Sequence, residues 1–278
     1  MQNAEDIKAA IVIIYFGALP KYFDLWRHTA QLNNQIHFHV IGDSVQTSRD
    51  KNISYHALSI DEFNSLTLMK TEGLELRSAY KICDYKPLIA ELFPELISGY
   101  RYWGFGDFDV LYGDILSVVG DSFGKFDYVS TGWEGESGPL AFLVNSEKVN
   151  TLWRSISSIH SKLNNPECTG IDEHEFLDAL KQKCSCDIIF RECLYDLPAQ
   201  WREGKLLSLR HEREYALYHF GGTGLQKPKS RIIKKASKLI EHIRRGGAIR
   251  IGRRNNLIRS GLISMIVSRW TERLTGEN

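Results

Sequence analysis

The chain has 278 residues, 43% of them hydrophobic and 25% charged, which predicts one ordinary globular domain with a small appendage. No run of about 18 uncharged apolar residues occurs in the sequence, which excludes a membrane-spanning helix. The net charge is +1, but residues 227–278 carry +11 (14 Lys or Arg against 3 Asp or Glu), and the remaining 21 basic and 31 acidic residues leave −10 on residues 1–226.

The first predicted elements are a strand, a helix and a second strand. The apolar run AAIVIIYFG at 9–17 ends in glycine and is typical of a buried strand that opens a doubly wound sheet. Apolar residues at mostly helical spacing predict a helix over 20–32, and IHFHVIGD at 36–43 predicts a strand that ends in a Gly-Asp loop. This strand–helix–strand opening favours a parallel sheet.

The later segments continue the alternation of helices and strands. YRYWGFGDFDVLYGDI at 100–115 leads aromatic and β-branched residues into an acidic turn, as in a central strand that delivers carboxylates to its end. The other elements are predicted as helices at 78–96, 149–163 and 171–183, and as strands at 128–133 and 138–146. We therefore predict an α/β fold with a main domain over residues 1–229.

The sharpest local signal is the acidic pair Asp107 and Asp109, separated by one residue. Alternation along a strand would place both carboxylates on one face, where they can approach one hard cation. A nucleotide diphosphate needs such a cation, because it bridges the phosphates and neutralises the charge of the leaving group. Taken alone, such a pair more often belongs to a solvated acidic turn than to a metal site.

A second signal lies shortly before this pair. Lys81, Asp84 and Lys86 occur in a Lys-x-Cys-Asp-x-Lys-Pro motif, and a lysine and an aspartate at the start of a helix could contact a donor sugar and its phosphates. The alternative is a capped helix start, with Asp84 as the N-cap and Pro87 in the first turn.

The third signal is His219-Phe-Gly-Gly, followed by Lys227-Pro. A neutral imidazole is a good ligand for manganese, glycines allow backbone N–H groups to approach phosphate, and a lysine supplies a point charge. Each feature alone is also typical of an ordinary loop.

The order of these signals resembles bacterial GT-A glycosyltransferases of surface-polysaccharide clusters. The shared pattern is Lys-x-Cys-Asp-x-Lys-Pro, Trp-Gly-x-x-Asp-x-Asp, and a terminal His-Phe-x-Gly with Lys-Pro, over residues 9–229. A more distant likeness joins the chain to the lipopolysaccharide galactosyltransferase and glycogenin group. The resemblance implies a GT-A-like, Rossmann-type, mostly parallel sheet flanked by helices.

The resemblance also implies roles for particular residues. A divalent cation, Mn²⁺ or Mg²⁺, would be held by Asp107, Asp109 and His219. The UDP-sugar donor would be contacted by Lys81, Asp84, Lys86 and Asp107, with its diphosphate on Gly222 and Lys227 and its uracil and ribose on Tyr15, Phe16 and Gly17. Lys227 lies five residues beyond Gly222 instead of three, and Lys229 replaces the terminal tryptophan of the distant group.

Asp172 and Glu173 are candidates for the general base of an inverting enzyme. Such a base takes the proton of the acceptor hydroxyl. The alternative is a helix start with acids in its first turn, where the helix dipole favours them.

The basic segment over residues 230–278 is predicted as a helical extension. Its mixture of Lys and Arg with Ile, Leu, Met and Trp suits amphipathic helices on an anionic membrane surface. A basic helix packed on the main domain is the alternative. Nucleic acid is a third option for this segment, but we expect no nucleic-acid partner, because the rest of the chain is acidic and has no recognised nucleic-acid motif.

These observations predict a metal-dependent glycosyltransferase that extends a bacterial lipid-linked or cell-surface glycan. Because the first residues, MQNAEDIKAA, do not form a basic region before an apolar signal sequence, we expect a cytoplasmic protein, peripheral on the inner face of the membrane. Two alternatives stay open: a catalytically inert GT-A-like module that binds a glycan or a partner, and a metal-dependent nucleotidyltransferase.

Overall fold

The computed structural model describes residues 9–132, 138–188, 191–194, 199–219, 241–242, 245, 247–251 and 266–267. The chain divides into two compact units. The first comprises Met1–Leu19, Asn34–Asp107 and Val119–Arg191, and the second comprises Pro20–Asn33, Phe108–Val118 and Glu192–Asn278. The domain boundary predicted between residues 229 and 230 lies outside the described residues.

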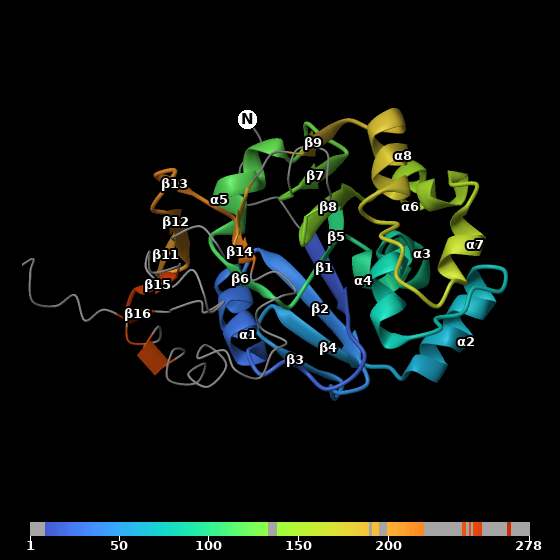
Figure 1. Cartoon of the computed structure of the whole chain (residues 1–278), viewed down its shortest axis with the longest axis horizontal. Coiled ribbons are helices and arrows are strands. Elements are labelled where there is room, and N and C mark those ends of the chain that lie inside the picture. The colour runs from blue at the N-terminus through green and yellow to red at the C-terminus, as the bar shows by residue number, and fades with distance from the viewer. Residues whose placement is uncertain are drawn as a thin grey trace, which may run out of the picture. The chain divides into compact units, whose positions relative to one another are not determined.

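The first unit is built on an eight-stranded sheet, ordered β3-β4-β2-β1-β5-β8-β7-β9 (Figure 1). The pairs β1–β2, β2–β4, β1–β5 and β7–β9 are parallel, and the other three are antiparallel. The strands are β1 (Ala9–Ile14), β2 (Ile36–Gly42), β3 (Ser48–Asp50), β4 (Ile53–Ala57), β5 (Tyr102–Gly106), β7 (Tyr128–Ser130), β8 (Leu140–Val144) and β9 (Cys186–Ile188). The predicted α/β fold with a mostly parallel sheet is confirmed.

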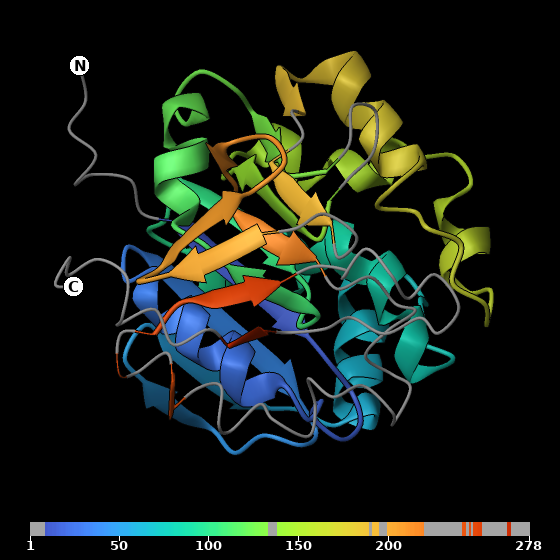
Figure 2. The same ribbon diagram turned by 60° about the vertical axis from the view of Figure 1, so that its left-hand side comes forward.

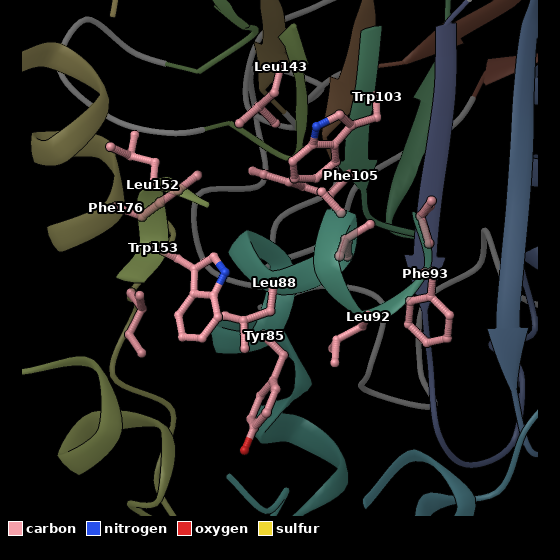
Figure 3. Close-up of a cluster of buried hydrophobic side chains, with 14 of the residues drawn as sticks. Tyr85, Leu88, Leu92, Phe93, Trp103, Phe105, Leu143, Leu152, Trp153 and Phe176 are labelled. Atoms are coloured by element: carbon pink, nitrogen blue, oxygen red, sulfur yellow. The ribbon is translucent and has the colours of Figure 1, made fainter. Parts of the chain in front are cut away.

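Helices of the first unit pack against this sheet over a large apolar core. They are α2 (Ile60–Lys70), η2 (Ala79–Leu88), α3 (Ile89–Leu92), α4 (Pro94–Ile97), η3 (Gly120–Ser122), α6 (Glu147–Asn150), η4 (Leu152–Ser155), α7 (Ile159–Leu163) and α8 (Glu175–Lys183). Figure 3 shows how large side chains from η2, α3, η4 and α8 meet those of β5 and β8 in this core. Trp103 and Trp153 are buried in it, and their indole N–H groups donate to Asn150 and Glu91.

Two of the predicted long helices are broken in the structure. The segment 78–96 divides into η2, α3 and α4, and Phe93, which precedes Pro94, has an extended φ of −131°. A residue before proline is disfavoured in the helical region, so the helix ends there and Pro94 starts a new one. The segment 149–163 likewise divides among α6, η4 and α7.

The second unit contains α1 (Phe23–Leu32), α5 (Ile115–Val119, which ends in the first unit) and two small sheets. One sheet is ordered β10-β14-β6, with β6 (Val110–Tyr112), β10 (Glu192–Leu194) and β14 (Leu217–His219). The other is ordered β13-β12-β11-β15-β16, with β11 (Ala199–Arg202), β12 (Lys205–Ser208), β13 (Arg213–Glu214), β15 (Ile249–Ile251) and β16 (Ile266–Val267). Its strands are drawn in orange to red in Figure 2.

The strands β15 and β16 lie in the segment for which the sequence predicts helices. β15 pairs antiparallel with β11 and with β16, so these five residues extend a sheet. In the described part of the chain, no helix is long and apolar enough to cross a membrane.

Candidate active site

The strand order of the eight-stranded sheet reverses beside β1. This strand pairs in parallel with β2 on one side and with β5 on the other, so the loops that follow β1 and β5 leave the same edge of the sheet. Open α/β sheets bind ligands outside the carboxyl ends of their strands at such a point. Residues 15–17 follow β1 there, and Asp107 follows β5.

Close backbone contacts fix the loop after β1. The N–H of Tyr15 donates to the carbonyl of Ile41 at 2.9 Å, and the N–H of Gly17 donates to the carboxylate of Asp43 at 2.8 Å. Gly42 permits this approach, because a Cβ added to it would lie 2.0 Å from the carbonyl oxygen of Tyr15.

The predicted uracil and ribose contacts fall on residues of different accessibility. Phe16 is 6% exposed and packs edge-on against Phe63, with 5.6 Å between the ring centroids. Its side chain belongs to the core, so the predicted contact of Phe16 with a nucleoside would have to use its backbone and stays a prediction. Gly17 is exposed, with a φ of +100° that favours glycine, and Tyr15 is half-buried. Tyr15 and Gly17 are therefore the members of this loop that a ligand can contact.

The segment AYKICDYKPL forms a ten-residue 3-10 helix, η2. Residues i and i+3 lie above one another in such a helix, so its side chains fall on three faces. The apolar face carries Ala79, Ile82, Tyr85 and Leu88; the ionic face carries Lys81, Asp84 and Pro87; and the site face carries Tyr80, Cys83 and Lys86. The apolar face packs into the core of the first unit.

On the ionic face, Lys81 and Asp84 form a fully buried ion pair. The Nζ of Lys81 lies 2.6 Å from Oδ2 of Asp84, and both side chains are 0% exposed. The ammonium also donates to the carbonyl oxygens of Lys162 and Glu167, so all three of its donors are used. The structure corrects the assignment of Lys81 and Asp84 to donor binding, because neither side chain has surface that a ligand could touch.

Asp84 also fixes the turn that leads to the predicted catalytic acids. Its carboxylate accepts the N–H groups of Thr169 at 2.8 Å and Ile171 at 2.9 Å. Burial alone would raise the pKa of Asp84, but the hydrogen bonds that it accepts lower it below its usual value. The chain passes from this turn into Asp172 and Glu173, so η2 positions both acids.

Lys86, on the site face, joins two carboxylates from distant segments. Its Nζ lies 3.1 Å from Oδ1 of Asp107 and 3.3 Å from Oδ2 of Asp172. Burial alone would lower the pKa of Lys86, but the two carboxylates raise it well above its usual value. The exposed fraction of the side chain is 33% for Asp107, 14% for Lys86 and 6% for Asp172. Asp107 is therefore the member of this cluster that is most open to a ligand.

Glu173 differs from Asp172 in its surroundings. Asp172 is buried against Lys86, whereas Glu173 is exposed. Partial burial of the Glu173 carboxylate and the adjacent charge of Asp172 raise the pKa of Glu173 above its usual value. A carboxylate that is accessible and has a raised pKa is suited to accept a proton from a substrate.

The structure places Asp107 and Asp109 in the connection between two strands. β5 ends at Gly106 and β6 begins at Val110, so strand alternation does not place their carboxylates. Phe108, between them, is buried in the second unit against Trp26, with 4.8 Å between the ring centroids. Asp107 belongs to the first unit and Asp109 to the second.

In the second unit, Asp109 meets His219. β6 pairs antiparallel with β14, which sets His219 opposite Val110. The Nε2 of His219 lies 3.5 Å from Oδ2 of Asp109, and the side chains are 24% and 25% exposed. An imidazole and a carboxylate that lie together and reach solvent fit the ligand preferences of Mn²⁺.

Part of the predicted metal and phosphate site is not tested by the described residues. Within these residues, no group of three His, Cys, Asp or Glu side chains could hold a metal ion. The prediction that Asp107 joins Asp109 and His219 as a third ligand stays a prediction. Gly222 and Lys227 lie outside the described residues.

Residues 11–246 of the sequence match a family described as "Family of unknown function (DUF6625)". The chain belongs to this family. No curated protein matches the sequence. Among solved structures, the chain is similar to the apo form of the glycosyltransferase GlyE from Streptococcus pneumoniae TIGR4, with 10% sequence identity and a TM-score of 0.48. The similarity covers 83% of this chain and 59% of that chain, so this chain spans about three fifths of the length of the protein that it matches.

Proposed function

We propose that the protein is a glycosyltransferase that moves a sugar from a nucleotide-sugar donor, of the UDP-sugar class, to a hydroxyl of a glycan acceptor. The observation that carries the proposal is the cluster of Asp107, Lys86 and Asp172 at the carboxyl edge of the sheet, where the strand order reverses. This edge is where α/β folds bind nucleotides, and the cluster supplies the charged groups that such a ligand needs.

The chain's own residues divide the work of the transfer. Tyr15 and Gly17 belong to the loop after β1, where a nucleoside would lie, and Asp107, at the end of β5, is the carboxylate of the cluster that is most open to a ligand. Lys86 holds Asp107 and Asp172 in place and lowers the repulsion between the two carboxylates.

Glu173 is the candidate base of an inverting transfer. The acceptor oxygen forms a bond to the anomeric carbon while its proton passes to Glu173. The bond from the anomeric carbon to the phosphate oxygen breaks, and the nucleotide diphosphate leaves with the electron pair. Of the two acids proposed from sequence, Glu173 suits this role better, because Asp172 is buried and paired with Lys86.

A divalent cation is the proposed cofactor, and Asp109 and His219 are the described residues that would hold it. Two protein ligands leave coordination positions for phosphate oxygens, water and further carboxylates. When bound, such an ion neutralises the negative charge that develops on the departing diphosphate.

The acceptor is proposed to be a lipid-linked or surface glycan of a bacterial cell. The support is the charge of +11 on residues 227–278, which suits attachment to an anionic membrane surface on the cytoplasmic side. Most of this segment lies outside the described residues.

The test of the function is a panel of nucleotide sugars incubated with the full chain and Mn²⁺, with release of free nucleotide as the readout. We expect one donor class to be cleaved, with UDP-sugars first, and the release to stop when EDTA removes the cation. Cleavage of no nucleotide sugar, with or without added oligosaccharide acceptors, would overturn the proposal.

A further inference from the structure

Among the described residues of the first unit, the most exposed aromatic side chain lies on the site face of η2. Tyr80 is 71% exposed, although large aromatic rings are usually packed away from water. Its neighbour Lys81 is fully buried in an ion pair with Asp84, which anchors the backbone next to Tyr80. Ser78, just before it, donates to the carbonyl of Pro166 at 3.3 Å and secures the start of the helix.

The spacing of η2 sets Tyr80 in line with the acidic cluster. Tyr80, Cys83 and Lys86 are three residues apart, so they stack along one face with about 6 Å between successive side chains. Lys86, at the far end of this row, contacts Asp107 and Asp172. The row therefore runs from the exposed ring to the proposed centre of transfer.

Electrostatic coupling supports the same placement. The pKa of Tyr80 is raised, first by Cys83 and partial burial, and then by Cys168, Asp107 and Glu173. The charges of Asp107 and Glu173 are thus among those that act on the hydroxyl of Tyr80.

We propose that Tyr80 is the platform of a sugar-ring subsite on the site face of η2, in line with Lys86 and its two carboxylates, a proposal that rests on the proposed function. The apolar face of a hexopyranose presents C–H groups, which pack favourably on the electron-rich face of an aromatic ring, while its hydroxyls stay exposed to polar partners. An exposed ring on the same helix face as Lys86, which contacts Asp107 and Asp172, offers apolar and polar contacts along one row. A purely apolar occupant would leave the charged groups next to the ring without their water.

The subsite is tested first by binding, without the need for turnover. The probes are methyl α- and β-glucopyranoside and methyl α- and β-galactopyranoside, observed by saturation-transfer NMR with the full chain. We expect a signal that falls at least about fivefold in Tyr80→Ala and is retained in Tyr80→Phe, because the ring and not the hydroxyl makes the platform. Met69→Ala is the matched control, since Met69 is 74% exposed on α2 and its truncation also removes a large apolar side chain.

A kinetic measurement identifies whether the donor sugar or the acceptor sugar packs on the ring of Tyr80. With a cleaved donor and an accepted glycan, Tyr80→Ala should raise one KM about tenfold, which corresponds to about 1.4 kcal/mol. A rise in the acceptor KM assigns the platform to the acceptor, and a rise in the donor KM assigns it to the donor sugar; both support the subsite.

The inference and the proposed function fail in different ways. Equal NMR signals in the wild type, Tyr80→Ala and Met69→Ala, or no signal with any of the four glycosides, would overturn the subsite. Glycoside binding that depends on Tyr80 in a protein that cleaves no nucleotide sugar would keep the subsite and reject the transferase.

Discussion

The helix η2 carries two lysines, five residues apart. Both form ion pairs with carboxylates, but the two pairs differ in their exposure to solvent. Lys81 pairs with Asp84 where both side chains are 0% exposed, and its remaining donors go to backbone carbonyls. Lys86 pairs with Asp107, whose side chain is 33% exposed, and with the buried Asp172. The first pair is closed on every side, whereas the second leaves a carboxylate open to a ligand.

The difference indicates that an ion pair of this helix can take part in ligand binding only where one of its side chains reaches solvent. The buried pair contributes position, because Asp84 anchors the turn before Asp172 and Glu173. The open cluster contributes chemistry. Both follow from a period of three residues, which sends Lys81 and Lys86 to different faces of one helix.

The largest expected effect is on stability, at the closed pair. Asp84→Ala should lower the free energy of unfolding by about 3–5 kcal/mol, because it leaves the ammonium of Lys81 buried without its counter-charge. Urea unfolding followed by circular dichroism measures the change. A loss below about 1 kcal/mol would show that other groups stabilise the charge of Lys81, and would contradict the structural role of the Lys81–Asp84 pair.

The next largest effect is expected at Glu173, the exposed acid that follows the turn held by Asp84. Glu173→Gln should slow sugar transfer at least about a hundredfold while donor affinity is unchanged, which is the usual size of a general-base contribution. Asp178→Asn, at another exposed acid of the first unit, serves as the control. Near-normal transfer by Glu173→Gln would mean that the base lies elsewhere or that the configuration is retained.

A third buried basic side chain, His39, differs from both lysines because no carboxylate stabilises its charged form. His39 is 6% exposed, and its Nδ1 lies 3.0 Å from Nε2 of His56. Burial, together with the positive charges of His37, His56 and Arg49, lowers the pKa of His39 to about 3. The folded chain therefore keeps this histidine neutral at pH values where the unfolded chain, with a pKa of about 6.5, protonates it.

The sign of the resulting pH dependence follows from that difference. The contribution of His39 is fully present above pH 6.5 and is lost as the pH falls below that value, by about 1.4 kcal/mol at pH 5.5. His39→Gln should remove this part of the loss between pH 7.5 and 5.5 in urea unfolding. An equal loss in the variant and in the wild type would contradict the assignment to His39.

The sequence predicts the central sheet better than the elements around it. The apolar run at 9–17 and the aromatic run at 100–115 contain β1 and β5, because buried parallel strands leave a strong local signal. The sequence pattern at 78–96 predicts a helix but does not distinguish an α-helix from a 3-10 helix, and only the period of three separates the buried pair of η2 from its site face.

The remaining features of the site depend on contacts between distant segments. The approach of Asp84 to Thr169 and the pairing that brings His219 to Asp109 join residues 85 and 110 positions apart, and no local pattern encodes them. Tyr80 has a signal in the sequence, since it precedes Cys83 and Lys86 at intervals of three, but this signal has meaning only in a 3-10 helix.

The most direct test of the account is donor cleavage by Asp107→Asn, measured as nucleotide release from a UDP-sugar in the presence of Mn²⁺. The substitution keeps the shape of the side chain and removes the charge that faces both Lys86 and the ligand. We expect release to fall at least about a hundredfold, with the free energy of unfolding changed by less than about 1 kcal/mol. Asp121→Asn, at an exposed carboxylate of η3, should behave as the wild type. Equal rates of release by Asp107→Asn and Asp121→Asn would contradict the claim that this cluster is the centre of transfer.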